Sequence, residues 1–198
     1  MAQAQSPYVK LADKRPEELA DRLKFDDQAR ALLAPDLSVD AYVERLNGAG
    51  LYTKAVAVLA HALPKREAVW WACTAVRKAA PPPPDSPAAA ALIAAENWVR
   101  RPSEENRRAA HKCAQEAENQ SPSTWTAYGA FWSGDNMAPV GLPPVAPGDA
   151  LTGRAVAGAV TLAAVEQEPQ RASEKYLSFT AIALDIARGG DGRSKTGE

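Results

Sequence analysis

The chain is poor in the residue types that usually build metal centres, disulfide frameworks and nucleophilic active sites. Its 198 residues include only two cysteines and two histidines. Cys73 and Cys113 both fall in helical, partly apolar contexts, which favours two reduced, packed thiols over a disulfide bond. A metal centre needs three or four converging ligands, and no spacing of His and Cys provides them. We therefore expect neither a metal nor a cofactor.

An excess of charge of one sign and a long hydrophobic run are also missing. The chain has 23 basic and 24 acidic side chains, without the basic stripe of a nucleic-acid-binding protein. The longest uncharged, apolar-rich stretch towards the C-terminus, residues 155–165, is shorter than the roughly 20 residues that cross a bilayer. The N-terminal residues lack the apolar segment of a secretory signal. We expect a cytoplasmic protein without a nucleic-acid or membrane partner.

What is abundant is alanine, within an apolar content of 46%. A core rich in alanine and poor in phenylalanine favours closely packed helices over sheets. Apolar spacing, N-cap residues and helix breakers predict ten helices, with ends near 16–24, 26–34, 39–48, 51–63, 64–79, 88–101, 104–119, 121–132, 151–167 and 169–188. We expect an all-α fold, an irregular bundle of about ten helices packed as antiparallel pairs. A repeat-like α-superhelix is the alternative, although the sequence shows no regular period.

Proline divides the chain. Residues 80–87, APPPPDSP, contain four consecutive prolines, which cannot lie inside a helix because they remove backbone donors. We expect this stretch to be a break, and a spacer rather than an SH3-type ligand, within a main helical domain at 35–188. An N-terminal helical segment at 1–34 precedes the domain, and a disordered tail at 189–198 follows it.

The first candidate site is the tryptophan pair Trp70–Trp71 in an almost wholly apolar helix. Neighbouring side chains point about 100° apart on a helix, so the two indoles cannot share one face. One reading places one indole in the core and the other against a neighbouring helix. The other reading makes one of them a partner anchor, because tryptophan is enriched at interface hot spots. Lys65 and Arg66 begin the same helix, where cations are unfavourable, which solvation, pairing with acids or a partner would explain.

The second candidate site is the aromatic helix near residue 130 and the loop that follows it, residues 133–149. Trp125, Tyr128 and Trp132 form a stripe on one helix face, which is more typical of core than of a binding face. The long irregular loop is the better functional candidate, although Ser133, Asp135 and Asn136 also fit a solvated turn. The candidate partner-binding residues are Lys65, Arg66, Trp70, Trp71, Trp125, Trp132, Ser133, Asp135, Asn136 and Met137.

No catalytic pattern is found. His111 and Cys113 lie two positions apart and therefore on different faces of a helix. Residues 153–158, GRAVAG, have the glycines of a phosphate loop, but alanine and valine follow where Lys and Ser/Thr are required. We therefore expect no enzymatic activity.

Glycine and alanine make residues 153–164 a thin helix that neighbours can approach closely. Gly158 costs about 1 kcal/mol relative to alanine inside a helix. We expect close packing against an aromatic residue to offset this cost, with Trp70, Trp71 or Trp132 as the filling side chain.

Three segments carry a resemblance to a known family. They are residues 62–73 (ALPKREAVWWAC), residues 127–134 (AYGAFWSG) with Ala138 and Pro139, and residues 153–164 (GRAVAGAVTLAA). Together they resemble an uncharacterised family of proteobacterial all-helical proteins, over most of residues 35–187. Some members of that family lie near type VI secretion genes that encode spike and PAAR-type tip proteins. The resemblance implies an accessory or adaptor protein for effector loading, and it implies no catalytic residue.

The sequence favours a non-enzymatic protein-interaction module. It would be an accessory adaptor or chaperone-like component of a bacterial type VI secretion or related contractile apparatus, and its partner would be a secretion spike, tip or effector protein. The first alternative is a small-molecule-binding or catalytic helical protein with a pocket between the tryptophan-pair helix and loop 133–149. The second alternative is an immunity or regulatory protein that caps a toxin, which an acidic surface patch would favour.

Overall fold

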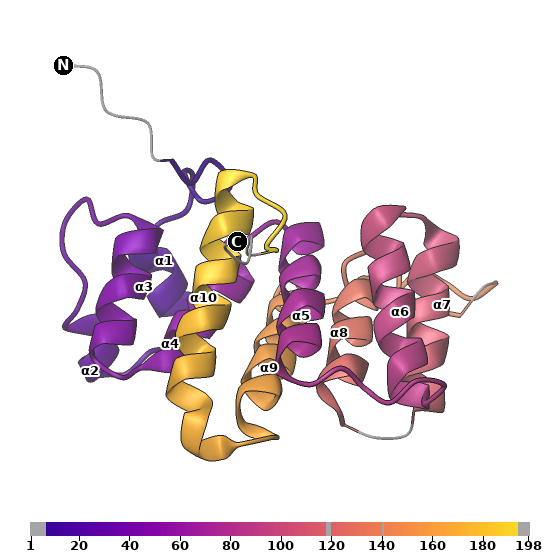
Figure 1. Cartoon of the computed structure of the whole chain (residues 1–198). Helices are drawn as coiled ribbons and strands as arrows, with labels where there is room; N and C mark the ends of the chain where they lie inside the picture. The colour runs from indigo at the N-terminus through magenta and orange to yellow at the C-terminus, as the bar shows by residue number, and fades with distance from the viewer. Residues whose placement is uncertain (1–6, 118–119, 140, 194–198) are drawn as a thin grey trace.

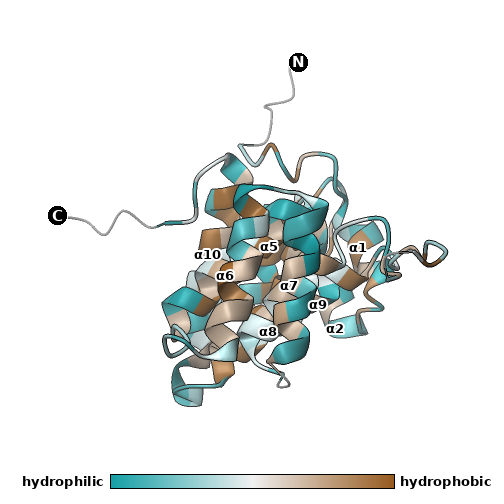
Figure 2. Ribbon diagram, turned by 90° about the vertical axis from the view of Figure 1, so that its right-hand side faces the viewer, coloured by the Kyte–Doolittle hydropathy of each residue, from teal (hydrophilic) through white to brown (hydrophobic). Residues whose placement is uncertain are grey.

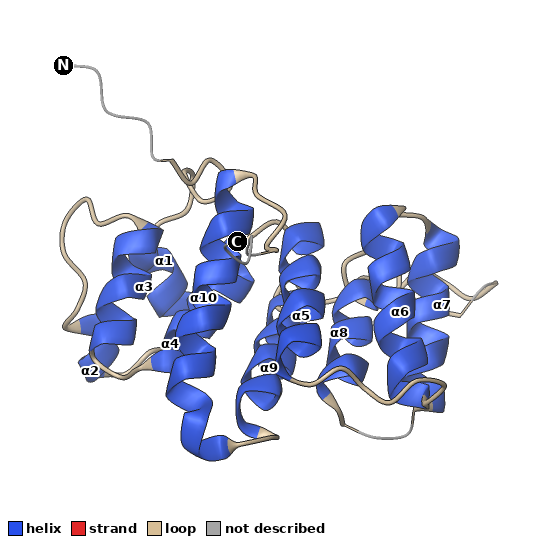
Figure 3. Cartoon of the chain, in the orientation of Figure 1, coloured by secondary structure: helices blue, strands red, loops and turns tan. Residues whose placement is uncertain are grey.

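The computed structural model describes residues 7–117, 120–139 and 141–193, and within these residues it contains helices and no strand (Figures 1 and 3). The helices are α1 (Pro16–Arg22), α2 (Asp27–Arg30), α3 (Val39–Gly48), α4 (Tyr52–Ala62), α5 (Lys65–Ala79), α6 (Pro87–Arg100), α7 (Glu104–Glu116), α8 (Pro122–Phe131), α9 (Leu151–Val165), the 3₁₀ turn η1 (Pro169–Arg171) and α10 (Ala172–Arg188). The predicted all-α fold of ten helices is confirmed.

Serine side chains begin four of these helices. Each accepts a hydrogen bond from the backbone N–H three residues further on, which is the usual N-cap interaction. The caps are Ser38 of α3, Ser86 of α6, Ser103 of α7 and Ser121 of α8. Most helices therefore begin within a residue or two of the positions that the sequence predicts. The main differences are α2, a single turn that ends at Arg30, and α10, which η1 precedes.

The helices form a row in which α5 and α9 lie in the middle (Figure 1). Helices α6, α7 and α8 pack against one another at one end, and α1, α2 and α3 lie at the other end next to α4. Helix α9 contacts α4, α5 and α8, and α10 returns to pack against α4 and α5. In a helical repeat protein each unit would contact only its neighbours in sequence. The return of α9 and α10 to the middle of the row makes this an irregular bundle and not a superhelix.

The core lies where these helices meet, and the visible helices carry both hydrophilic and hydrophobic residues (Figure 2). The largest fully buried side chains are Trp71, Tyr42 and Phe179. The polar atoms of the first two are satisfied: the Trp71 indole donates to the carbonyl of Phe179 at 2.8 Å, and the Tyr42 hydroxyl donates to the carbonyl of Ala29 at 3.0 Å. Buried polar groups need such partners. The hydrogen bond from Trp71 therefore ties α5 to α10 as well as filling the core.

The glycines of α9 contact different residues from those predicted. The residue beside Gly158 is Trp125, at 3.9 Å from the position that a Cβ atom would occupy. That is an ordinary contact, so Gly158 is not a position of close helix packing. The expectation that Trp70, Trp71 or Trp132 fills the space beside Gly158 was wrong. The tight position is Gly153, where a Cβ atom would lie 2.6 Å from the His61 ring. Gly153 therefore sets how closely α9 approaches α4.

Candidate functional site

The structure separates the two neighbouring tryptophans. Trp71 is fully buried, so it offers no surface to a partner and leaves the set of candidate partner-binding residues. Trp70 is partly exposed, and its indole donates to the carbonyl of Asp191 at 2.7 Å. The guanidinium of Arg193 lies 5.5 Å from the centre of the Trp70 ring, a favourable cation–π arrangement. The first described residues of the predicted tail, 189–193, thus pack on α5; residues 194–198 lie outside the described residues.

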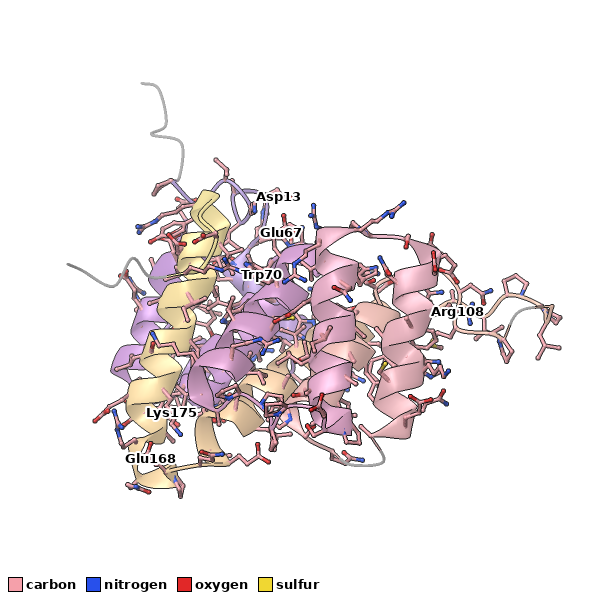
Figure 4. The ribbon with its side chains drawn as sticks, turned by 45° about the vertical axis from the view of Figure 1, so that its right-hand side comes forward. Asp13, Glu67, Trp70, Arg108, Glu168 and Lys175 are labelled. Carbon is pink, nitrogen blue, oxygen red and sulfur yellow. The ribbon has the colours of Figure 1, made fainter. Side chains whose placement is uncertain are left out.

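Two adjoining hollows flank Trp70. The larger, about 560 Å³, lies between α5, α6, α10 and the C-terminal residues 192–193, and we call it the Trp70 pocket. The smaller, about 420 Å³, is bounded by Lys10, Glu67, the ends of α6 and α10, and residues 190–193. In Figure 4, Glu67 and Trp70 lie on the same part of α5, close to the N-terminal segment. Loop 133–149 forms no wall of either hollow, which differs from the pocket expected between that loop and the tryptophan-pair helix.

An ion-pair triad lines the Trp70 pocket. Glu96 on α6 is buried and accepts hydrogen bonds from Nε and Nη2 of Arg77 at 2.7 and 3.1 Å. Arg100, one helical turn further along α6, lies 3.7 Å from the same carboxylate. The hydrogen bonds that Arg77 donates to Glu96 raise the pKa of Arg77 further above its ordinary value. One buried carboxylate therefore fixes two guanidinium groups on the pocket wall.

Lys65 and Arg66, at the start of α5, have structural partners in other segments. The Lys65 ammonium donates to the carbonyl of Ser133 at 3.2 Å, and Arg66 Nε donates to the carbonyl of Val99 at 2.7 Å. The second bond joins the start of α5 to the end of α6, as expected for an antiparallel pair. Both side chains remain exposed. The first bond also joins two predicted candidates, Lys65 and Ser133, that lie far apart in the sequence.

The predicted stripe on α8 forms an aromatic cluster that reaches the surface. Tyr128 and Trp132 stack with ring centres 5.2 Å apart, and Trp125 lies 6.2 Å from Tyr128 and 6.3 Å from Trp132. All three rings are partly exposed and line a hollow of about 440 Å³ with α7 residues such as Gln115. We call Trp125, Tyr128 and Trp132 the aromatic surface. By contrast, Phe131 of the same helix is buried and stacks on His111 at 3.8 Å.

The loop that follows α8 projects from the body beside α7 (Figures 1 and 4). A buried arginine holds its base. Arg107 pairs with Glu104 through Nε and Nη2, both at 2.7 Å, and donates to the carbonyls of Phe131 and Asn136 at 2.6 and 2.7 Å. Arg108 adds a bond to the carbonyl of Ala138. The hydrogen bonds from Arg107, and then those from Arg108, lower the pKa of Glu104 to about 2.

The first loop residues differ in role. The Asn136 side chain accepts the backbone N–H groups of Ala138 and Val145, and the Met137 N–H donates to the carbonyl of Val145 at 2.7 Å. Asn136 and Met137 therefore close the base of the loop, with Met137 partly exposed. Ser133 bonds the carbonyl of Ala130, as a turn residue does, and Asp135 is exposed. Leu142 and Val145 stand 59% and 53% exposed, which gives the loop an apolar outer part.

The histidines and cysteines lie in surroundings that favour their neutral forms. Burial, together with the positive charges of Arg22 and Arg154, lowers the pKa of His61 to about 4. Burial also lowers the pKa of His111 and raises the pKa of both Cys73 and Cys113. In the part of the chain that the structure describes, no group of three or more His, Cys, Asp or Glu side chains is placed to hold a metal ion.

Sequence reasoning missed Arg77, Glu96, Arg100 and Arg107, although three of them had a detectable signal. Glu96 and Arg100 are an i, i+4 pair on a helix that is otherwise apolar, and this spacing favours an ion pair. Arg107 lies three residues after Glu104 in the same way. The contacts of Arg107 to Phe131 and Asn136 depend on the tertiary fold and have no sequence signal.

The fold and the two surfaces define an all-α protein with a cationic pocket beside Trp70 and a partly exposed aromatic surface on α8. Residues 42–187 match a family of unknown function, DUF6931, and the chain belongs to this family. The predicted likeness to an uncharacterised family is confirmed in this respect. No curated protein and no solved structure matches the chain. Among the described residues, no helix has both the length and the hydropathy needed to cross a membrane.

Proposed function

We propose that the chain is a non-enzymatic protein-interaction module that binds its partner through the aromatic surface and the adjoining loop. The observation that carries this proposal is the partial exposure of Trp125, Tyr128 and Trp132 on one side of the bundle. Large aromatic residues dominate the binding energy of protein interfaces when a partner covers them. Isolated exposed apolar residues need no such explanation, but a contiguous patch does.

The chemistry around the aromatic surface supports contact with a protein. Within the described residues, neither Trp125 nor Trp132 donates a hydrogen bond from its indole N–H. Each indole therefore keeps a donor for a partner in addition to its apolar area. The exposed residues Gln115 and Gln120 supply polar groups at the edge of the same hollow. An apolar centre with a polar rim is the usual composition of a protein interface.

The loop adds a second contact region whose position is fixed. Arg107, Arg108 and Asn136 hold its base, while Leu142 and Val145 project their apolar side chains into solvent. A loop fixed at its base loses less conformational freedom on binding than a free one, which favours affinity. The loop therefore suits recognition better than an unanchored segment of equal length.

The finer part of the proposal is the cellular role. We place the chain as an accessory adaptor or chaperone-like component of a bacterial type VI secretion or related contractile apparatus, with a spike, tip or effector protein as its partner and the cytoplasm as its location. The support is the family resemblance in the segments 62–73 and 127–134. An immunity protein that caps a toxin is the less favoured alternative, because the walls of the Trp70 pocket carry more cations than carboxylates.

The test compares captured proteins between variants. Full-length tagged chain is used to purify partners from its host, with quantitative mass spectrometry of the bound proteins. We expect at least one protein to be retained by the unaltered chain and to fall by about 30-fold with Trp125→Ala/Trp132→Ala, since hot-spot residues contribute about 2 kcal/mol or more. Leu142→Asp/Val145→Asp tests the loop in the same assay.

A matched control removes exposed apolar surface elsewhere. Ile93 on α6 and Leu177 on α10 are both 47% exposed, and Ile93→Ala/Leu177→Ala should retain the partner. Circular dichroism must show that all the variants remain folded. Equal capture of every bound protein by all variants would contradict the proposed surface. Turnover of a substrate by the purified chain would contradict the non-enzymatic role.

A further inference from the structure

We propose that the Trp70 pocket binds a small phosphate monoester that carries a flat ring, of about the size of a mononucleotide. This goes beyond the proposed partner-binding role, because the pocket lies between α5, α6 and the C-terminal residues 192–193, whereas the aromatic surface lies on α8. The charge, the hydrogen-bond donors, the apolar wall and the volume of this pocket all suit such a ligand.

The charge of the pocket walls is unusual for a chain with a net charge of −1. Arg77, Lys78 and Arg100 face one carboxylate, that of Glu96, which leaves two uncompensated positive charges. Arg193 adds a further cation at the wall. With Arg193 the excess is three positive charges, and a phosphate monoester, which carries about −1.5 to −2 charges at pH 7, compensates half of it or more. A monocarboxylate would compensate only one third of it.

The donors are held in place before a ligand binds. Arg77 uses Nε and Nη2 for Glu96, and a guanidinium has five N–H donors, so Arg77 has donors left for a second acceptor. The described residues provide no carboxylate partner for Lys78 or for Arg193. Guanidinium groups bind phosphate through paired hydrogen bonds and lysine binds it as a point charge. Because Glu96 is buried, it fixes the nearest guanidinium without itself blocking the pocket.

The flat ring of the proposed ligand is inferred from the apolar residues that line the Trp70 pocket. Trp70 of α5 and Ile182 of α10 add an aromatic and an aliphatic surface to the lining of the pocket. The Arg193 guanidinium lies 5.5 Å from the centre of the Trp70 ring, so a cation and an aromatic surface are next to each other on the pocket wall. The volume of about 560 Å³ lies within the range of small-molecule sites, about 300–1,000 Å³.

Calorimetric titration of the full-length chain tests the proposal. The probes are AMP, GMP, CMP, UMP and phenyl phosphate, with adenosine and inorganic phosphate as arms that lack the charge or the ring. We expect at least one ester to bind at least tenfold more tightly than adenosine and at least tenfold more tightly than inorganic phosphate. Binding should weaken as salt is raised, because screening reduces the attraction between the charges.

Variants locate the site. Lys78→Ala and Arg193→Ala each remove a cation that has no ion-pair role in the described fold, and each should weaken ester binding about tenfold, as expected for the loss of a charge-assisted contact. Trp70→Leu should remove the preference for the ester over inorganic phosphate. Lys112→Ala on α7 is the control: it removes an exposed lysine that is remote from the pocket lining and should leave binding unchanged.

Three results would overturn the proposal. The first is the absence of binding heat with all five esters at millimolar concentration. The second is inorganic phosphate binding as tightly as the best ester. The third is equal affinity in the Lys78→Ala, Arg193→Ala and Lys112→Ala variants. None of these results affects the capture experiment, which depends on Trp125 and Trp132, so the two proposals fail independently.

Discussion

The two ends of the helix row are stabilised by different interactions. The end at α3 and α4, taken together with the middle helices α5, α9 and α10, is packed by apolar side chains, and Trp71, Tyr42 and Phe179 are its largest fully buried residues. The end built from α6, α7 and α8 contains Glu96 and Arg107, the two charged residues that are buried in the described chain. We call these the apolar end and the ionic end.

This difference indicates which side chains must keep their positions and partners for the proposed binding surfaces to form. Apolar packing is tolerant of side-chain exchange when volume is kept. A buried ion pair contributes little net stability, but loss of one partner is costly because the other is left unsatisfied. Both features proposed for binding depend on the ionic end, since Glu96 orients the pocket arginines and Arg107 holds the loop. We therefore expect the apolar end to supply stability and the ionic end to position the surfaces.

The largest effect is expected at the apolar end, from Trp71→Ala. This change opens a cavity in the centre of α5 and leaves the carbonyl of Phe179 without its indole donor. Removing a fully buried tryptophan costs about 4 kcal/mol of the free energy of unfolding. Trp70→Ala, one residue away, should cost about 1 kcal/mol, because Trp70 is partly exposed and has one backbone hydrogen bond.

Urea unfolding followed by far-ultraviolet circular dichroism measures both changes. The pair is a direct comparison of adjacent indoles in one helix, so propensity and sequence context are matched. Equal losses for the two variants would mean that burial does not distinguish them. The central place of Trp71 in the apolar end would then be wrong.

The next largest effect is expected at the ionic end, from Arg107→Ala. The variant leaves the carbonyl of Phe131 without its charged donor and the carbonyl of Asn136 with only the longer bond from Arg108, at 3.4 Å, at about 3 kcal/mol for the two together. Arg108→Ala is the matched control, since Arg108 also pairs with Glu104 but is more exposed, and it should cost about 1 kcal/mol. Limited proteolysis should cut within residues 133–149 faster in Arg107→Ala than in Arg108→Ala.

The proteolysis result separates two roles for Arg107. Faster cutting with a normal urea midpoint would indicate that Arg107 positions the loop and does not stabilise the bundle. A lower midpoint with unchanged cutting would contradict the view that the ionic end positions the surfaces. The expected result is both a lower midpoint and faster cutting.

Most of the helices could be predicted from the sequence because their signals are local. Ser38, Ser103 and Ser121 are the N-caps of α3, α7 and α8, and Pro102 and the four prolines at 81–84 lie outside helices. The residues of the pocket and of the loop base could not be predicted. Trp70 meets Asp191, and Arg107 meets Asn136, through the tertiary fold alone. The spacing of Trp70 and Trp71 showed that they face differently, but not which of them faces the core.

A smaller effect should distinguish two glycines of α9 at the apolar end. In Gly153→Ala the new methyl group would meet the His61 ring at 2.6 Å, and the resulting displacement should cost about 2 kcal/mol. In Gly158→Ala the new methyl group would make an ordinary contact with Trp125 at 3.9 Å, so the variant should gain up to about 1 kcal/mol from helix propensity. Thermal unfolding of the two variants should therefore shift Tm in opposite directions. A lower Tm in both would show that α9 is tightly packed along its whole length.

The smallest effect is a dependence of stability on pH that differs between the two ends. His61 has its pKa lowered from 6.5 to about 4, so between these values the unfolded chain binds a proton that the folded chain does not. The free energy of unfolding is therefore unaffected by His61 above pH 6.5 and falls as the pH decreases from 6.5 to 4. We expect a loss of about 1–2 kcal/mol, after allowance for screening at this partly exposed ring. At the ionic end Glu104, with its pKa lowered to about 2, stabilises the fold until pH falls below about 4.5.

Acid should thus weaken the apolar end before the ionic end. Urea midpoints between pH 7 and pH 4 should fall less in His61→Asn than in the unaltered chain, while Glu104→Gln should keep the full decrease in this range and lose only the further decrease below pH 4.5. His111 at the ionic end also has a lowered pKa. The variant His111→Asn therefore measures how much of the decrease in urea midpoint above pH 4.5 is due to His111. If His111→Asn removed more of the decrease above pH 4.5 than His61→Asn, acid would act first on the ionic end, and the order of the two ends would be reversed.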